Sequence, residues 1–258
     1  MRDVIFMDPK SVINWKVFGI LLTVSILHLL FALIIVTILR VAYVRTVPFE
    51  FMVDVFPALL VVFQAMGLGM QIFIGLYLGK RVGMGAPLLE SWLDGGIIRG
   101  RVVSILKLSL VLGIIVAGLK FFVDRFIFSQ FVPSLLLQWK QIPFEFRWVI
   151  PFQQGIGDEI SYRLFWMTIL IWIIYKIQKP ENNQPATLTF WIPILIVSVF
   201  SGLSPLFWGA SLLITLQYLF FSYIGGIVFG WLYWKKGIES AIIAHFLSSM
   251  VLVCLSFM

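Results

Sequence analysis

Long apolar runs make up most of the chain, and short segments rich in charge, glycine and proline separate them. Seven of these runs approach or exceed the roughly 20 residues that a helix needs to span a bilayer core. The alternation of polar and apolar residues that is typical of a membrane β-barrel is absent. We therefore expect an all-α, polytopic transmembrane helical bundle. The predicted spans cover residues 15–39, 51–79, 102–122, 147–175, 189–208, 211–234 and 238–257.

The segment DRFIFSQFVPSLLLQWKQIP, residues 124–143, leaves the number of spans open at seven or eight. It is aromatic and interrupted by Pro133, so it could lie in the interface, dip partway into the membrane, or cross it. The first run has about 25 residues and no small-residue cleavage site, which predicts a retained helix rather than a removable signal. Without internal repeats or low-complexity tracts, residues 1–258 are expected to form a single integral membrane domain.

Composition agrees with this class. The 258 residues are 61% hydrophobic and 12% charged, and the mean hydropathy is +1.03, whereas soluble domains are about a quarter charged. The net charge of +7 comes mostly from basic residues at the ends of apolar runs, where they set topology and meet anionic lipid. Their distribution predicts a cytoplasmic N-terminus, the lipid bilayer as a partner, and no nucleic acid. Cys254 is the single cysteine, so an intrachain disulfide and a cysteine-rich metal site are excluded.

Charged residues gather inside the fourth run, in the stretch GDEISYRLFW. Glu159 and Arg163 are four residues apart, so on an α-helix they share a face, and Arg163 can neutralise and orient the carboxylate. Asp158 points about 100° away, toward different surroundings. An ionisable residue within a span is a functional hypothesis by default, and a carboxylate that can take up or release a proton near neutral pH suits general acid–base catalysis. The competing interpretation is an ion pair that only ties helices together.

The chain has two histidines, and they differ in their neighbours. His245 lies in the last run with Ser249 one helical turn away, so Ser249 could fix its tautomer. A lone histidine on a helix is more often a hydrogen-bonding group between helices than a catalyst. His28 has no acidic neighbour in the sequence, and we interpret it as structural.

The fifth and sixth runs carry small residues at regular spacing. Ser198, Ser201 and Ser204 recur every three residues and precede a proline, an arrangement that is common in helix packing. Gly226 and Gly230 form a small-xxx-small pair, which predicts a close approach of two helices.

Three of these stretches together resemble a known family. GDEISYRLFW, VFSGLSPLF and GWLYWKKGIESAIIAHFLSS follow in this order on separate predicted spans. They are similar to the EExxxR, FxxxH and HxxxN motifs of the CPBP family, the type II CAAX prenyl endopeptidases and related prokaryotic Abi proteins. The resemblance covers about residues 148–258 and implies a CPBP-like core there. It also implies an integral protein of a prokaryotic cell membrane.

The motifs depart from the family at three positions. Asp158 stands where the first glutamate is expected, Ser204 where the second motif has histidine, and Ser249 where the third ends in asparagine. Serine cannot accept a proton at neutral pH as histidine can. The retained motif residues are Glu159, Arg163, Phe200 and His245.

The resemblance implies an intramembrane endopeptidase that hydrolyses a peptide bond of a membrane-associated, lipidated or unmodified protein. Asp158 or Glu159 would activate the water, and His245 would polarise the carbonyl or stabilise the oxyanion. Ser249 would orient His245, and Ser204 would supply a weaker hydrogen bond in place of the histidine. The implied mechanism uses no metal and no cofactor.

Other functions stay open at this point. A family member with an impaired site could act as a scaffold or binding protein for a transmembrane or lipidated partner. Ser204 could instead be a nucleophile with His245 as its base, although the two lie on different spans. A transporter that uses the acids for proton coupling would usually show paired broken helices in two symmetric halves, which the sequence lacks.

Overall fold

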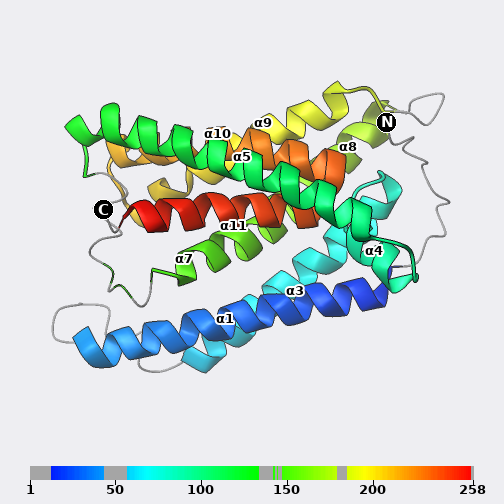
Figure 1. The fold of residues 1–258 in the computed structure, drawn as a ribbon, viewed down its shortest axis with the longest axis horizontal. Coiled ribbons are helices and arrows are strands. Elements are labelled where there is room, and N and C mark those ends of the chain that lie inside the picture. Colours follow the sequence, from blue (N-terminus) through cyan, green and yellow to red (C-terminus); the bar gives the residue numbers. More distant parts are fainter. Residues whose placement is uncertain are drawn as a thin grey trace.

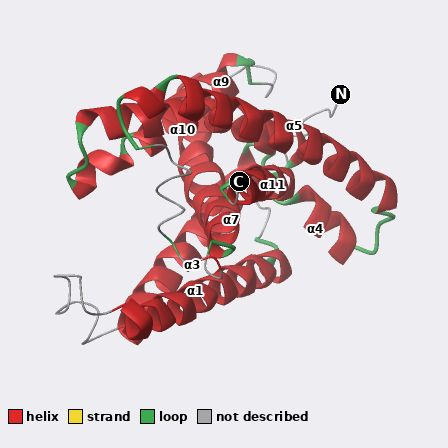
Figure 2. Cartoon of the chain, turned by 60° about the vertical axis from the view of Figure 1, so that its left-hand side comes forward, coloured by secondary structure: helices red, strands yellow, loops and turns green. Residues whose placement is uncertain are grey.

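The computed structural model describes residues 13–43, 57–133, 147–178 and 185–256, with Ile142 and Phe144. Within these ranges the regular elements are helices and no strand occurs (Figures 1 and 2). They are α1 (Trp15–Tyr43), α3 (Pro57–Arg81), α4 (Pro87–Leu93), α5 (Arg99–Phe126), η1 (Phe128–Gln130), α7 (Val149–Phe152), η3 (Gln153–Met167), α8 (Thr168–Gln178), α9 (Leu188–Gly202), η4 (Ser204–Trp208), α10 (Leu212–Lys236) and α11 (Ile238–Leu255).

Seven helical stretches of the described chain are long and apolar enough to cross a membrane, which confirms the predicted all-α membrane bundle. Their order matches the predicted spans. The third is longer than expected, because α5 and η1 together carry it from Arg99 to Gln130, whereas the sequence predicted 102–122. Most of the remaining part of the segment 124–143 lies outside the described residues. The predicted alternative of an eighth span in this segment also lies outside them.

The last helix, α11, occupies the middle of the bundle. It contacts α5 and α10 on one side and α7 and η3 on the other (Figures 1 and 2). The helices α1 and α3 pack against each other, and both contact η3. The charged stretch of η3 therefore faces the interior of the bundle, where α11 is its neighbour.

A tight turn sets α10 against α11. Gly237 joins them with φ of 99°, a backbone conformation that residues with a side chain rarely adopt. A Cβ at this position would lie 2.3 Å from Cδ of Pro87, so the turn also needs the missing side chain for space. The two helices leave this turn side by side, and Phe229 on α10 comes to rest against His245 on α11.

Glycines also bring α9 and α10 together. A Cβ at Gly226 would lie 2.2 Å from Oγ of Ser198, and one at Gly230 would lie 3.1 Å from Cγ1 of Ile194. The predicted close packing at this glycine pair is confirmed. Ser198 donates to the carbonyl of Ile194, which satisfies its hydroxyl within α9 as expected for a packing serine.

The fourth span differs from the continuous α-helix that the sequence predicted. It consists of α7, η3 and α8, and η3 is a π-helix of 15 residues that contains the whole charged stretch. A π-helix bonds each N–H to the carbonyl five residues back, so its turn is wider than an α-helical one, and such turns often occur at functional sites. The spacing of 100° per residue therefore does not hold here, although residues four apart still share a face.

Candidate active site

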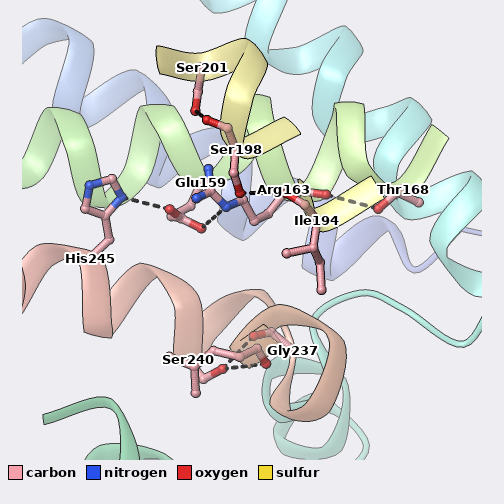
Figure 3. A network of polar contacts seen from close by, with 10 residues as sticks. Glu159, Arg163, Thr168, Ile194, Ser198, Ser201, Gly237, Ser240 and His245 are labelled. Carbon is pink, nitrogen blue, oxygen red and sulfur yellow. Dashed lines mark hydrogen bonds and ion pairs between the residues drawn. The ribbon is translucent and has the colours of Figure 1, made fainter. Parts of the chain in front are cut away.

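Glu159 joins two helices at the centre of the bundle. Its side chain is fully buried, and each carboxylate oxygen faces a basic group (Figure 3). Oε1 lies 2.8 Å from Nδ1 of His245 on α11. Oε2 lies 3.4 Å from Nε of Arg163 on η3. The predicted pair of Glu159 and Arg163 is confirmed, and His245 adds a third member to it.

A cavity of about 380 Å³ opens beside this trio. The helices α5, η3, α10 and α11 and the turn at the end of α9 form its wall. Gly225 on α10 leaves space for the Lys120 side chain in this wall, since a Cβ there would lie 3.1 Å from Nζ of Lys120. The lining residues are Lys120, Gln153, Gln154, Asp158, Tyr162, Arg163, Ser201, Ser204, Tyr218, Phe221, Ser222, Gly225, Gly226, Phe229, His245 and Leu252.

The two neighbouring acids have different surroundings. Asp158 lines the cavity and is partly exposed, whereas Glu159 has no exposed surface and uses both oxygens on Arg163 and His245. This separation agrees with the expectation that the two carboxylates point in different directions. Asp158 is thus the acid that can reach a water or substrate in the cavity, and Glu159 is placed to orient the groups around it.

His245 is fixed from two sides. The Phe229 ring stacks on the imidazole with centroids 4.5 Å apart and an interplanar angle of 25°, while Nδ1 faces the Glu159 carboxylate. An ionised Glu159 accepts a hydrogen bond from Nδ1–H, which leaves Nε2 as the ring nitrogen for the cavity. A neutral His245 in this tautomer offers an acceptor there, not a donor.

The remaining motif positions fall in three different places. Ser204 lines the cavity at the start of η4, where α9 has ended and Pro205 prevents its continuation. Ser249 donates to Oε1 of Gln154 at 2.6 Å, so its hydroxyl ties α11 to η3 instead of orienting the imidazole. Phe200 is half exposed on the outside of α9 and does not line the cavity.

Comparison with protein families gives a match to one family in the second half of the chain. Residues 140–251 match the sequence model described as type II CAAX prenyl endopeptidase, Rce1-like. The chain carries an Rce1-like domain. Comparisons with curated proteins and with solved structures give no significant match. The matched range contains η3, α9, α10 and α11 up to residue 251, and with them every motif residue of the CPBP-like core that the sequence predicted at about 148–258.

The cavity wall also includes a residue from outside the Rce1-like domain. Lys120 comes from α5, and the sequence interpretation passed over it because a lysine near the end of a predicted span is commonly an interfacial anchor. Its position two residues inside the predicted span was the available signal.

His28, which also lies outside the Rce1-like domain, contacts a residue of the cavity wall without lining the cavity itself. From α1 its Nε2 lies 3.1 Å from Oε1 of Gln153, an amide that itself lines the cavity. The structural interpretation of His28 is compatible with this contact, but its neighbour across helices could not be read from the sequence.

The described chain offers a carboxylate, an imidazole and cations around one cavity. Lys120 and Arg163 are the positive groups of its wall, and Asp158 is the negative one, with the Glu159 carboxylate directly behind. In the part of the chain that the structure describes, no three side chains among histidine, cysteine, aspartate and glutamate are grouped to hold a metal ion. Such an arrangement can bind a water molecule, remove its proton and stabilise a transient negative charge.

Proposed function

We propose that this protein is an intramembrane endopeptidase that hydrolyses a peptide bond of a membrane-associated protein, with lipidated proteins as the first substrates to test. The observation that carries the proposal is the buried trio of His245, Glu159 and Arg163 directly beside a cavity lined by Asp158. This trio lies within the Rce1-like stretch of a helical membrane protein, and the matching family is one of CAAX prenyl endopeptidases.

Water activation is assigned to Asp158. A water in the cavity would donate hydrogen bonds to the Asp158 carboxylate and to Nε2 of His245. The proton passes to Asp158 while the water oxygen forms a bond to the carbonyl carbon of the substrate. The carbonyl π-bond breaks and its electron pair moves to the oxygen, which becomes an oxyanion.

Collapse of the tetrahedral intermediate completes the reaction. The carbon–nitrogen bond breaks, and the proton held by Asp158 passes to the leaving nitrogen. The oxyanion electron pair re-forms the carbonyl double bond as the nitrogen leaves. The products are an amine and a carboxylic acid, which then gives its remaining water-derived proton to the amine, and the Asp158 carboxylate is regenerated. Glu159 and Arg163 are positioning residues in this scheme, because the Glu159 carboxylate holds the His245 ring and its tautomer, and Arg163 holds that carboxylate.

Reconstitution tests the proposal. The purified protein in liposomes is incubated with three probes: a farnesylated peptide with a free C-terminal tripeptide, the same peptide without the prenyl group, and a hydrophobic transmembrane peptide. Mass spectrometry identifies the cleaved bond. We expect cleavage of at least one probe by the wild type and loss of cleavage in Glu159→Gln and His245→Ala. The proposal is contradicted if the wild type cleaves none of the three probes, or if both variants cleave a probe as fast as the wild type does.

A scaffold that binds a transmembrane or lipidated partner is the second candidate. Ser204 favours it, since serine occupies the position where the resembled motif has histidine. This function predicts that His245→Ala leaves capture of the farnesylated peptide unchanged. For either function we place the N-terminus in the cytoplasm, from the distribution of basic residues, and the resemblance to prokaryotic family members implies a prokaryotic cell membrane. Protease accessibility in oriented vesicles tests that topology.

A further inference from the structure

Lys120 places a positive charge inside a membrane-spanning helix. It lies on α5 within the third span, where a charge is unfavourable by several kcal/mol unless it faces a polar cavity or a partner. Its ammonium lies against α10. A Cβ at Gly225 would come within 3.1 Å of Nζ, and the centroid of the Phe229 ring is 5.8 Å from Nζ. The lysine therefore points into the cavity described above.

The charge of Lys120 is available to a ligand. Among the residues that the structure describes, Nζ has no ion-pair or hydrogen-bond partner, although it interacts at longer range with the charges of Asp158, Glu159 and Arg163. Arg163, the other cation of the wall, is engaged by Glu159 at 3.4 Å. Phe229 contacts both Lys120 and His245, so the ammonium and the imidazole are both neighbours of this one ring in the cavity wall.

We propose that Lys120 is a further catalytic residue, whose ammonium stabilises the oxyanion of the tetrahedral intermediate. This inference rests on the proposed endopeptidase function. Lys120 exchanges no proton in the step: the water proton goes to Asp158, and the carbonyl electron pair goes to the oxygen that the ammonium faces. His245 with Nδ1–H on Glu159 offers no donor to that oxygen, so the scheme needs a positive group elsewhere on the wall.

The charge balance of the cavity makes the contribution specific to the transition state. In the resting site the charges of Lys120 and Arg163 balance those of Asp158 and Glu159. When Asp158 takes the proton it becomes neutral, and the oxyanion takes over its negative charge. Lys120 then faces the oxyanion directly, whereas in the resting site it interacts with the Asp158 charge only at longer range. The interaction with the oxyanion exists only after attack has begun, and such an interaction raises kcat without tighter substrate binding.

Kinetics of two variants tests this role. Lys120→Met keeps the unbranched chain and removes the charge, and Lys120→Arg keeps the charge. On the probe that the wild type cleaves, we expect kcat of Lys120→Met to fall by about 10²–10³-fold, with KM changed by less than about threefold. Lys120→Arg retains at least about ten times the kcat of Lys120→Met. Lys107→Met is the matched control, because Lys107 is exposed on the same helix and outside this cavity.

Binding of a transition-state mimic separates catalysis from folding. A peptide phosphonate with the sequence of the cleaved probe carries a tetrahedral anion at the scissile position, and the N-methylated amide peptide carries none. We expect Lys120→Met to bind the phosphonate at least about 100-fold more weakly than the wild type and the N-methylated peptide equally well. A variant that misfolds would lose both ligands.

Three results overturn the inference. Lys120→Met with kcat within about threefold of the wild type removes the role in catalysis. A loss confined to KM, with equal weakening of both peptides, makes Lys120 a ground-state binding group instead. Absence of cleavage by the wild type rejects the endopeptidase function itself, whereas activity in the wild type together with full activity in Lys120→Met rejects only the inference about Lys120.

Discussion

Replacing Glu159 with glutamine removes the negative charge that Arg163 and His245 share in the buried centre of the bundle. The carboxylate and the Arg163 Nε are 3.4 Å apart, and Coulomb's law with an effective dielectric constant of about 20 gives about 5 kcal/mol of attraction at that distance. Breaking a buried pair by removing one partner destabilises proteins by about 3–5 kcal/mol, because the other charge is left uncompensated. We therefore expect Glu159→Gln to lower the free energy of unfolding by about 3–5 kcal/mol.

A double-mutant cycle separates the pair from the rest of the site. Arg163→Met alone leaves the carboxylate without its strongest partner and is expected to destabilise comparably. The double variant leaves neither charge, so its loss should be smaller than the sum of the two single losses, with a coupling of about 1–3 kcal/mol. The assay is reversible unfolding in mixed micelles with increasing dodecyl sulfate, followed by helical circular dichroism.

Two outcomes would refute the reasoning about this pair. A destabilisation below about 1 kcal/mol in Glu159→Gln would show that water or another group compensates the charge of Arg163. Additive losses in the double variant would show that the two side chains do not interact in the membrane-embedded protein.

Three further changes test the site and the packing around it. Asp158→Asn should lower kcat by about 10²–10⁴-fold, while its stability should stay near that of the wild type because the side chain is partly exposed in the cavity. An unchanged kcat in the liposome assay would exclude Asp158 as the base. Ser204→His places an imidazole in the cavity wall and should raise kcat by about tenfold or more, whereas kcat of Ser204→Ala should stay within about threefold of the wild type. Loss of all activity in Ser204→Ala, together with fluorophosphonate labelling of the wild type, would instead favour a serine nucleophile. Gly226→Ala forces a Cβ to 2.2 Å from Oγ of Ser198 and should lower the free energy of unfolding by about 1–3 kcal/mol. The control Gly118→Ala, where a Cβ has nothing within 4 Å, should change that free energy by less than about 1 kcal/mol. Equal stability of the two variants in the unfolding assay would contradict the close approach of α9 and α10.

The pattern of apolar residues was sufficient to predict the spans, and the spacing of four residues was sufficient to predict the pair of Glu159 and Arg163. Both are local properties, because hydrocarbon requires about 20 consecutive apolar residues and a helical turn brings positions four apart together. Gly226 and Gly230 predicted a close helix contact for the same reason, although the partner helix was not identifiable. The motif order on separate spans was also enough to recognise the family, which the match at residues 140–251 confirms.

The wider turn of η3 could not be predicted from the sequence. Helix propensity and the periodicity of apolar residues assume the α-helical turn, whereas η3 is a π-helix packed against its neighbouring helices. Reasoning from helical spacing also explains why the sequence predicted that Ser249 orients His245. The two residues are one helical turn apart, yet Ser249 donates to Gln154 on a neighbouring element. A hydroxyl takes whichever acceptor the packing brings near, and sequence spacing describes only the acceptors on its own helix.

By itself, the sequence determined the class of the protein, the order of its spans, and the residue types that chemistry in a membrane requires. Only the tertiary structure decided which of the two acids reaches the cavity, that His245 turns Nδ1 toward Glu159, and that Lys120 from outside the Rce1-like domain completes the wall. The physical reason is distance along the chain. Periodicity constrains residues within a few turns of one helix, whereas a site between helices depends on the packing of side chains far apart in the sequence, such as Lys120 with Asp158, 38 positions apart, and Glu159 with His245, 86 positions apart.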